Sequence, residues 1–160
     1  MREPAPGKRV GIIHLQMVRE ERSLYGMGRI SSSWAAVEIT HPLMMMSDRE
    51  MLVVMSLSAN MEPLAVEIVA VGGLDGCVMD VRNIFKHSLL SNAANIICFH
   101  NHPSGDPTPS EYDYVATKKL SEAGALLGIG VVDHIIIGLD RFYSFKEHGE
   151  LDSPRYADAA

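Results

Sequence analysis

Stretches of apolar residues that are bounded by polar residues or glycine recur along the chain and predict a series of strands. Residues 51–57 form a near-continuous apolar run, as expected of a strand that is covered on both faces. A turn at residues 58–60 separates this run from the next one, so the two are expected to pair as an antiparallel hairpin. The strands predicted from the whole pattern are residues 10–18, 51–57, 64–71, 95–99, 131–137 and a short one at 141–145.

Helical spacing between these runs predicts three helices. The first begins at the serines 31–33, which suit a helix N-cap, and extends to about His41, with Pro42 leaving its end open. The second covers residues 78–90, and the third and longest covers residues 110–127 and ends near Gly128. One face of the second helix is expected to carry Val81, Ile84, Phe85, Ser88 and Leu89. Since strands and helices alternate, the fold class predicted is α/β, a sheet with helices on both faces.

Composition and charge narrow the range of functions. The 160 residues suit one domain, expected at 10–147, between a disordered leader at 1–9 and a polar tail at 148–160. The formal net charge of −6 offers no basic excess for phosphates, so nucleic-acid binding is not expected. No apolar run reaches the roughly 20 residues of a membrane span. Two cysteines without a Cys-x-x-Cys pattern favour a reducing cytoplasm over a disulfide framework.

Two histidines at the end of the 95–99 run are candidate metal ligands. Residues two apart on a strand point to the same side, so His100 and His102 can present both rings to one point. Neutral imidazole is a common zinc ligand. A His-x-His pair alone has an ordinary structural explanation, and the metal interpretation depends on a third ligand.

Asp113 is the third candidate, because of its place on the long helix. A helical wheel aligns it with an apolar face made of Ala116, Leu120, Gly124 and Leu127. A carboxylate on that face is costly unless it is paired, and the helix N-terminus favours its ionised form. Ser110 and Asp113 also fit a helix-capping pattern, which is compatible with metal binding. Three protein ligands would leave one tetrahedral position for water, as in catalytic zinc sites.

Hydrolysis by such a site needs a proton acceptor, usually a glutamate. Glu50, Glu62 and Glu67 all precede the histidines in the sequence, and spacing does not choose among them. Cys98 lies two residues before His100, but a small core residue is the better interpretation. Asp133 and His134 begin a later strand and are candidates to support the ligands from behind.

The pattern His100-x-His102-x7-Ser110-x2-Asp113 resembles the JAMM metalloprotease signature of MPN domains, position by position. The longer run from His100 to Ser110, with Asp-His-Ile-Ile-Ile-Gly at 133–138, is similar to the RadC-like branch of that family. The similarity extends from about Val10 to Glu147. It implies an MPN fold, a cytidine-deaminase-like three-layer sandwich in which helices cover both faces of a mixed central sheet.

The resemblance also implies roles for the site residues. His100, His102 and Asp113 would bind zinc, and Glu50 would take a proton from water and pass it to the leaving nitrogen. Ser110 would hydrogen-bond the oxyanion. The reaction would be attack of zinc-bound hydroxide on an amide or isopeptide carbonyl, with a protein or peptide as substrate.

Full-length RadC proteins carry a helix-hairpin-helix segment before the MPN domain, and this chain is expected to be a short form without it. The DNA-repair label of the family is therefore weaker here than the metallohydrolase assignment. The alternative is a non-proteolytic accessory protein in DNA repair or mobile-element biology that uses the domain for interaction. A zinc nucleoside deaminase would need a Pro-Cys-x-x-Cys segment, and the chain has none.

Overall fold

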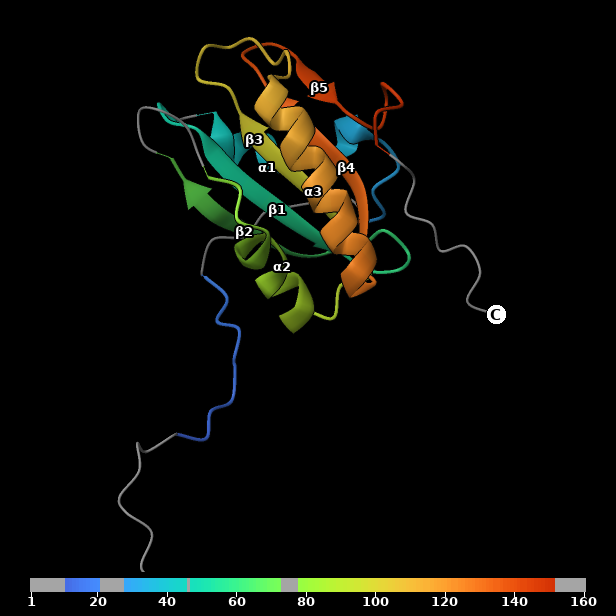
Figure 1. Cartoon of the computed structure of the whole chain (residues 1–160). Coiled ribbons are helices and arrows are strands. Elements are labelled where there is room, and N and C mark those ends of the chain that lie inside the picture. The colour runs from blue at the N-terminus through green and yellow to red at the C-terminus, as the bar shows by residue number, and fades with distance from the viewer. Residues whose placement is uncertain (1–10, 21–27, 46, 73–77, 152–160) are drawn as a thin grey trace, which may run out of the picture.

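The computed structural model describes residues 11–20, 28–45, 47–72 and 78–151. Within these ranges the chain forms five strands and three helices (Figure 1). In chain order they are α1 (Ser33–Met44), β1 (Met51–Leu57), β2 (Pro63–Val71), α2 (Val81–Leu90), β3 (Asn95–Asn101), α3 (Glu111–Leu127), β4 (Gly130–Ile137) and β5 (Phe142–Ser144). None of the helices in this described part is long and apolar enough to cross a membrane.

The strands form one mixed sheet with the order β2-β1-β3-β4-β5. β3 and β4 run parallel, and α3 supplies the crossover connection that parallel neighbours need; the other neighbours run antiparallel. β1 and β2 form the predicted antiparallel hairpin, with Met55 opposite Val66. The predicted strands from residue 51 onward are therefore confirmed, with ends that differ by one or two residues.

Helices cover both faces of the sheet, as predicted (Figure 1). Alternate residues of the central strands supply two separate apolar cores. Under α1 lie Met55, Phe99 and Ile135, each completely buried. The core between the sheet and the helices α2 and α3 contains the buried residues Val54, Ile96, Cys98, Ile136, Ile84, Phe85, Leu120 and Phe145. The three-layer α/β architecture expected for an MPN domain is what the structure shows.

The helix ends follow the capping signals in the sequence. The Ser32 side chain accepts a hydrogen bond from the Ala35 N–H and caps α1, which continues through Pro42 to Met44. The prediction ended this helix near His41. It runs further because a proline in the last turn frees only one carbonyl, that of Glu38, which is an exposed residue. On α2 Ile84, Phe85 and Ser88 are buried as expected, whereas Leu89 is 52% exposed.

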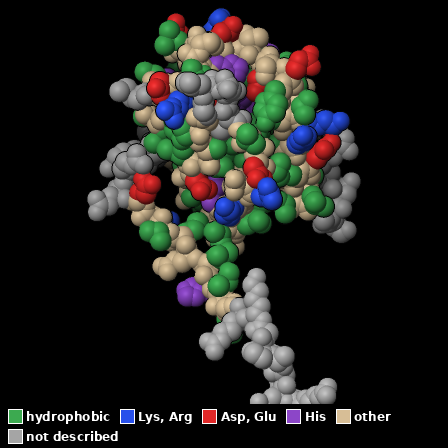
Figure 2. All heavy atoms as spheres, turned by 60° about the vertical axis from the view of Figure 1, so that its left-hand side comes forward, with side chains coloured by type: hydrophobic (Ala, Val, Ile, Leu, Met, Phe, Trp, Pro, Cys, Tyr) green, Lys and Arg blue, Asp and Glu red, His purple; other side chains and the backbone are tan. Residues whose placement is uncertain are grey.

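The predicted strand at residues 10–18 is wrong for residues 11–18. Residues 11–20 leave the body as an extended arm without regular structure (Figure 1). Apolar side chains are exposed along this arm (Figure 2). Ile12 and Val18 are almost fully exposed. The apolar pattern of a strand is present, but a strand also needs a neighbour for its backbone hydrogen bonds. Val10 and the expected leader at 1–9 lie outside the described residues.

The chain after β5 is packed against the body up to Leu151, although the sequence predicted a polar tail from His148 onward. The ring of His148 stacks on Tyr143 at a centroid distance of 3.9 Å, and the Tyr143 hydroxyl donates to Glu150. Leu151 is only 8% exposed. The folded part therefore extends to at least Leu151, and residues 152–160 lie outside the described part.

Candidate metal site

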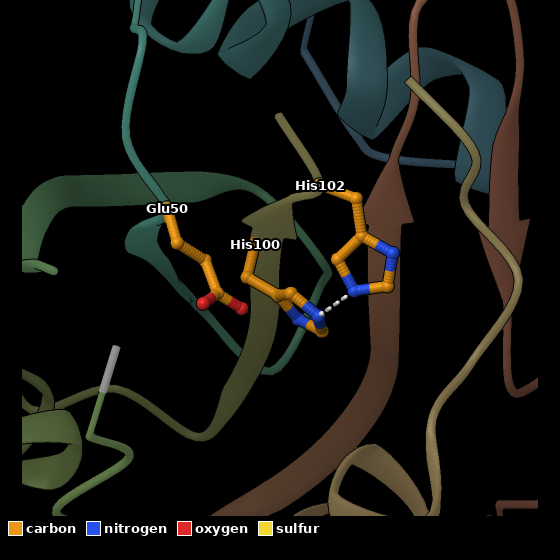
Figure 3. Close-up of side chains that lie close together, drawn as sticks. All are labelled: Glu50, His100 and His102. Atoms are coloured by element: carbon orange, nitrogen blue, oxygen red, sulfur yellow. Dashed lines mark hydrogen bonds between the residues drawn. The ribbon is translucent and has the colours of Figure 1, made fainter. Parts of the chain in front are cut away.

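His100 and His102 stand at the end of β3, next to the centre of the sheet. The strand geometry persists far enough for both rings to meet, with 3.1 Å between their Nε2 atoms (Figure 3). The side chain of His100 is 3% exposed and that of His102 is 18% exposed, so solvent reaches the site from the His102 side. The expectation that residues two apart would present both rings to one point is thus fulfilled.

The loop after His102 is held by the end of β4. The His102 N–H donates to the Ile137 carbonyl at 3.0 Å, and the Leu139 N–H donates to the Gly105 carbonyl at 3.0 Å. Gly105 has a φ of +83°, which a residue without a side chain adopts at no steric cost. The His102 Nδ1 lies 2.8 Å from the Asp106 carbonyl oxygen. A carbonyl only accepts, so this nitrogen carries the proton, and the Nε2 lone pair of neutral His102 faces the site.

Asp113 serves both as a helix cap and as an inward-facing acid, as the sequence predicted. Ser110 Oγ accepts from the Asp113 N–H, and Asp113 Oδ2 accepts from the Ser110 N–H at 2.7 Å, which completes a capping box. Although it stands in the first turn of α3, Asp113 is 3% exposed. Its Oδ1 lies 3.1 Å from His100 Nε2, and its Oδ2 lies 3.5 Å from His102 Nε2.

The three donor groups fit a zinc ion. Tetrahedral zinc with bonds of about 2.0–2.1 Å needs donor atoms about 3.3–3.4 Å apart. The observed separations among His100, His102 and Asp113 are 3.1, 3.1 and 3.5 Å. Two imidazole nitrogens and a carboxylate point their electron pairs at one another in a largely buried place. Such an arrangement repels itself unless a cation or a shared proton lies between the atoms.

Charge interactions within the cluster shift two pKa values. Burial raises the pKa of the Asp113 carboxyl, but the imidazoles of His100 and His102, which donate to it when they are protonated, outweigh burial and hold that pKa well below its ordinary value. The hydrogen bond to Asp113 raises the pKa of His102, although burial opposes it. Both shifts show that the site favours a carboxylate together with positive charge.

Glu50 is the glutamate that the structure brings to the histidines. It precedes β1, and the pairing of Leu52 with His100 brings the start of β1 beside the end of β3. One carboxylate oxygen of Glu50 and one ring nitrogen of each histidine all lie within 4.8 Å of one another (Figure 3). The other two candidates lie elsewhere. Glu62 lies at the opposite end of the hairpin, and Glu67 contacts His87 at 2.8 Å.

Behind the ligands the structure separates Asp133 from His134. Asp133 faces α1, where it accepts hydrogen bonds from Ser33 and Ser144, so it does not support the site. His134 contacts His100, with 2.9 Å between His134 Nε2 and His100 Nδ1. Thr117, which the sequence reasoning missed, lies 2.6 Å from the other nitrogen of His134. Its signal was present, since Thr117 follows Asp113 by one helical turn on the same face.

Cys98 is fully buried in the apolar core under α2 and α3, and burial raises the pKa of its thiol far above the ordinary value. This agrees with its interpretation as a core residue. A pocket opens beside the ligands on the same side of the sheet. It is lined by Glu50, Leu52, Met79, His100, Tyr112 and Asp113.

A mixed sheet with helices on both faces, and an open His/His/Asp cluster at a strand end, define a class of α/β domain compatible with metal-dependent hydrolysis. The RadC-like JAB domain family matches residues 30–150, and the chain belongs to this family. The resemblance seen in the motif is therefore confirmed.

Proteins similar to this chain carry the name UPF0758, which states no activity. One from Methanosarcina mazei is 40% identical over 121 residues, covering 76% of this chain and 53% of its own length. One from Listeria monocytogenes is 33% identical over 168 residues, covering 89% of this chain and 75% of its own. One from Desulforamulus reducens is 47% identical over 102 residues, covering 64% and 45%. This chain spans about half the length of the Methanosarcina relative.

Proposed function

We propose that this domain is a zinc-dependent hydrolase that cleaves amide bonds in a peptide or protein, as a peptidase or an isopeptidase. The observation that carries the proposal is the convergence of His100 Nε2, His102 Nε2 and the Asp113 carboxylate at 3.1–3.5 Å. His102 Nδ1 is already bonded on the far side of its ring, so its Nε2 electron pair is directed at the cluster.

His100, His102 and Asp113 would hold the zinc ion, and this ligand set leaves a coordination position for water or substrate. When bound, zinc supplies a Lewis acid and lowers the pKa of water to about 7. The partly exposed side of the site is the His102 side. Glu50 lies within 4.8 Å of both histidines.

Glu50 is in reach to act as the general base of the proposed reaction. It would accept a proton from the attacking water and return it to the leaving nitrogen. Ser110 would donate a hydrogen bond to the oxygen of the tetrahedral species. Its hydroxyl donates to Asp113 Oδ2 at 2.7 Å, so this role needs a rotation of the side chain toward substrate.

Apolar contacts next to the scissile carbonyl would come from the walls of the pocket. Leu52, Met79 and Tyr112 line the pocket beside the ligand residues. An acidic chain of net charge −6 favours a protein or peptide partner over nucleic acid. We also propose a cytoplasmic location, because a chain with two cysteines has no disulfide framework of the kind that oxidising compartments favour.

The test compares metal content and cleavage in the wild type and in Glu50→Gln. We expect about one zinc per chain in both, and cleavage of a fluorogenic library of linear and isopeptide-linked peptides by the wild type alone. A loss of about 10²–10⁴-fold in rate is expected for removal of a general base. Glu62→Gln, at the far end of the hairpin, is the matched control and should keep full activity.

Two outcomes would count against the proposal. Turnover by Glu50→Gln equal to that of the wild type would remove Glu50 as the base. A zinc-loaded wild type that cleaves no member of the library would favour the alternative of a non-proteolytic accessory protein.

A further inference from the structure

A β-bulge in β4 turns His134 toward the metal site. Ile96 and Ile97 of β3 are neighbours, yet they pair with Val131 and Asp133, so Val132 is an extra residue in β4. Without the extra residue, strict alternation from Val131 would place His134 on the α1 face. With it, His134 lies on the same face as His100. Bulges of this kind re-aim side chains next to functional sites.

The ring of His134 is completely buried and is fixed on three sides. It stacks on Phe145 with an interplanar angle of 5° and a centroid distance of 5.0 Å. Its Nε2 lies 2.9 Å from His100 Nδ1, and its Nδ1 lies 2.6 Å from Thr117 Oγ1. The Thr117 hydroxyl donates to the Asp113 carbonyl oxygen at 2.6 Å. A continuous chain of hydrogen bonds thus connects the backbone of one ligand to the ring of another.

Proton counting gives this chain of hydrogen bonds a single direction. The Asp113 carbonyl can only accept, so the one hydroxyl proton of Thr117 is used there. Thr117 Oγ1 must then accept from His134 Nδ1, which therefore carries the proton of the neutral ring. That leaves His134 Nε2 as an acceptor, and His100 Nδ1 has to donate to it. In the neutral ring of His100 the remaining nitrogen, Nε2, then carries no proton.

We propose that Thr117 and His134 are positioning residues, which hold His100 in the tautomer whose Nε2 electron pair faces the metal site. This inference rests on the metal site of the proposed function and goes beyond it in assigning a task to two residues outside the ligand set. Metal-binding histidines generally donate their second ring nitrogen to such a partner, and loss of the partner typically weakens metal binding about 10–100-fold. Here the partner is a second histidine, so its own tautomer has to be fixed, and Thr117 does this.

The decisive variant is Thr117→Val, which keeps the side-chain shape and removes the hydroxyl. His134 Nδ1 then loses its acceptor, and the reversed tautomers become favourable, because His100 Nε2–H can donate to Asp113 Oδ1, 3.1 Å away. Thr117→Ser restores the hydroxyl. Thr40→Val is the matched control, since the buried Thr40 hydroxyl of α1 donates to the Ala36 carbonyl one turn earlier in the same way.

The first measurement is the tautomer of His100 in the zinc-free protein, read by nitrogen-15 NMR of the imidazole rings. Signals of His100 are assigned by their absence in His100→Gln. We expect the Nδ1–H tautomer in the wild type, Thr117→Ser and Thr40→Val, and a shift toward Nε2–H in Thr117→Val. An unchanged tautomer in Thr117→Val would overturn the inference.

The second measurement is zinc affinity by competition with a chelator. Thr117→Val should bind zinc about 10–100-fold more weakly than the wild type, and Thr117→Ser and Thr40→Val within about threefold of it. Equal weakening in Thr40→Val would show a general packing effect and would overturn the inference. If the wild type bound no zinc, the proposed function would fail, and the tautomer measurement would still decide this inference.

Discussion

Replacing Asp113 by asparagine separates its role as a cap from its role as a ligand. Asparagine keeps the shape, and its amide oxygen can still accept from the Ser110 N–H, as Asp113 Oδ2 does at 2.7 Å. The amide NH₂ group then faces His100, where Asp113 Oδ1 lies 3.1 Å from Nε2. We expect the metal-free variant to fold and its free energy of unfolding to fall by about 1–2 kcal/mol. The helix N-terminus loses a negative partner, and so do the two hydrogen bonds that the N–H and the hydroxyl of Ser110 donate to Asp113 Oδ2.

In Asp113→Asn the rise in Tm on addition of zinc should change far more than the stability of the metal-free protein. A ligand at 100 times its dissociation constant stabilises the folded state by about 2.7 kcal/mol. For a domain of this size that corresponds to a rise in Tm of about 8–14 °C. If the variant binds zinc about 100-fold more weakly, the same zinc concentration gives about 0.4 kcal/mol, or about 1–2 °C.

The assay is a pair of thermal unfolding scans, with chelator and with zinc, for each protein. Asp80→Asn is the matched control, because Asp80 caps the N-terminus of α2 and contacts Arg82 rather than the cluster. We expect it to lower Tm slightly and to keep the full zinc response. A zinc response in Asp113→Asn as large as in the wild type would refute the assignment of Asp113 as a ligand.

Two further predictions concern parts of the fold outside the ligand set. Burial lowers the pKa of His87 despite the opposing Glu67 carboxylate, so below the ordinary pKa of 6.5 the unfolded chain binds more protons than the folded one. The free energy of unfolding of the wild type, relative to His87→Gln, should therefore fall as the pH is lowered from 7 to 5, by at most about 1.4 kcal/mol per pH unit in chemical denaturation. If the difference in the free energy of unfolding between the wild type and His87→Gln did not vary with pH, this prediction would be contradicted. Gly138→Ala should cost about 1–3 kcal/mol and weaken zinc binding, because a Cβ there would collide with the Gly105 carbonyl of the loop that follows His102. Gly11→Ala, in open space, is its control, and equal denaturation midpoints for the two variants would show that the loop yields without cost.

Much of the site could be predicted because its residues follow regular periodicities. His100 and His102 obey the two-residue period of a strand, and the helical wheel places Asp113 inward, where it is 3% exposed. The same wheel aligned Leu127 with the apolar face, yet Leu127 is 42% exposed, because it is the last residue of α3. Periodicity is most informative in the middle of an element and loses meaning at its end.

The rest could not be predicted because it depends on contacts between distant segments. Spacing left Glu50, Glu62 and Glu67 equivalent, and only the pairing of β1 with β3 brings Glu50 to the histidines. Asp133 and His134 are neighbours on β4 and so point to opposite faces of the sheet, and the extra residue in β4 decides that His134 is the one that faces the site. The arm at 11–18 has the composition of a strand, but composition does not supply a pairing partner.

Each ligand of the proposed site is held by something other than the metal. The capping box fixes Asp113 at the start of α3, the Asp106 carbonyl fixes the ring of His102, and His134 fixes the ring of His100. These supports come from separate segments, which meet only because β3 and β4 are parallel and α3 crosses between them. The fold therefore brings three mutually repelling electron pairs together before a cation arrives, and the packing energy of the domain offsets that repulsion. In a site organised in this way, little of the free energy of metal binding is offset by ordering of the chain. This distinguishes it from small zinc domains, which fold only with their metal.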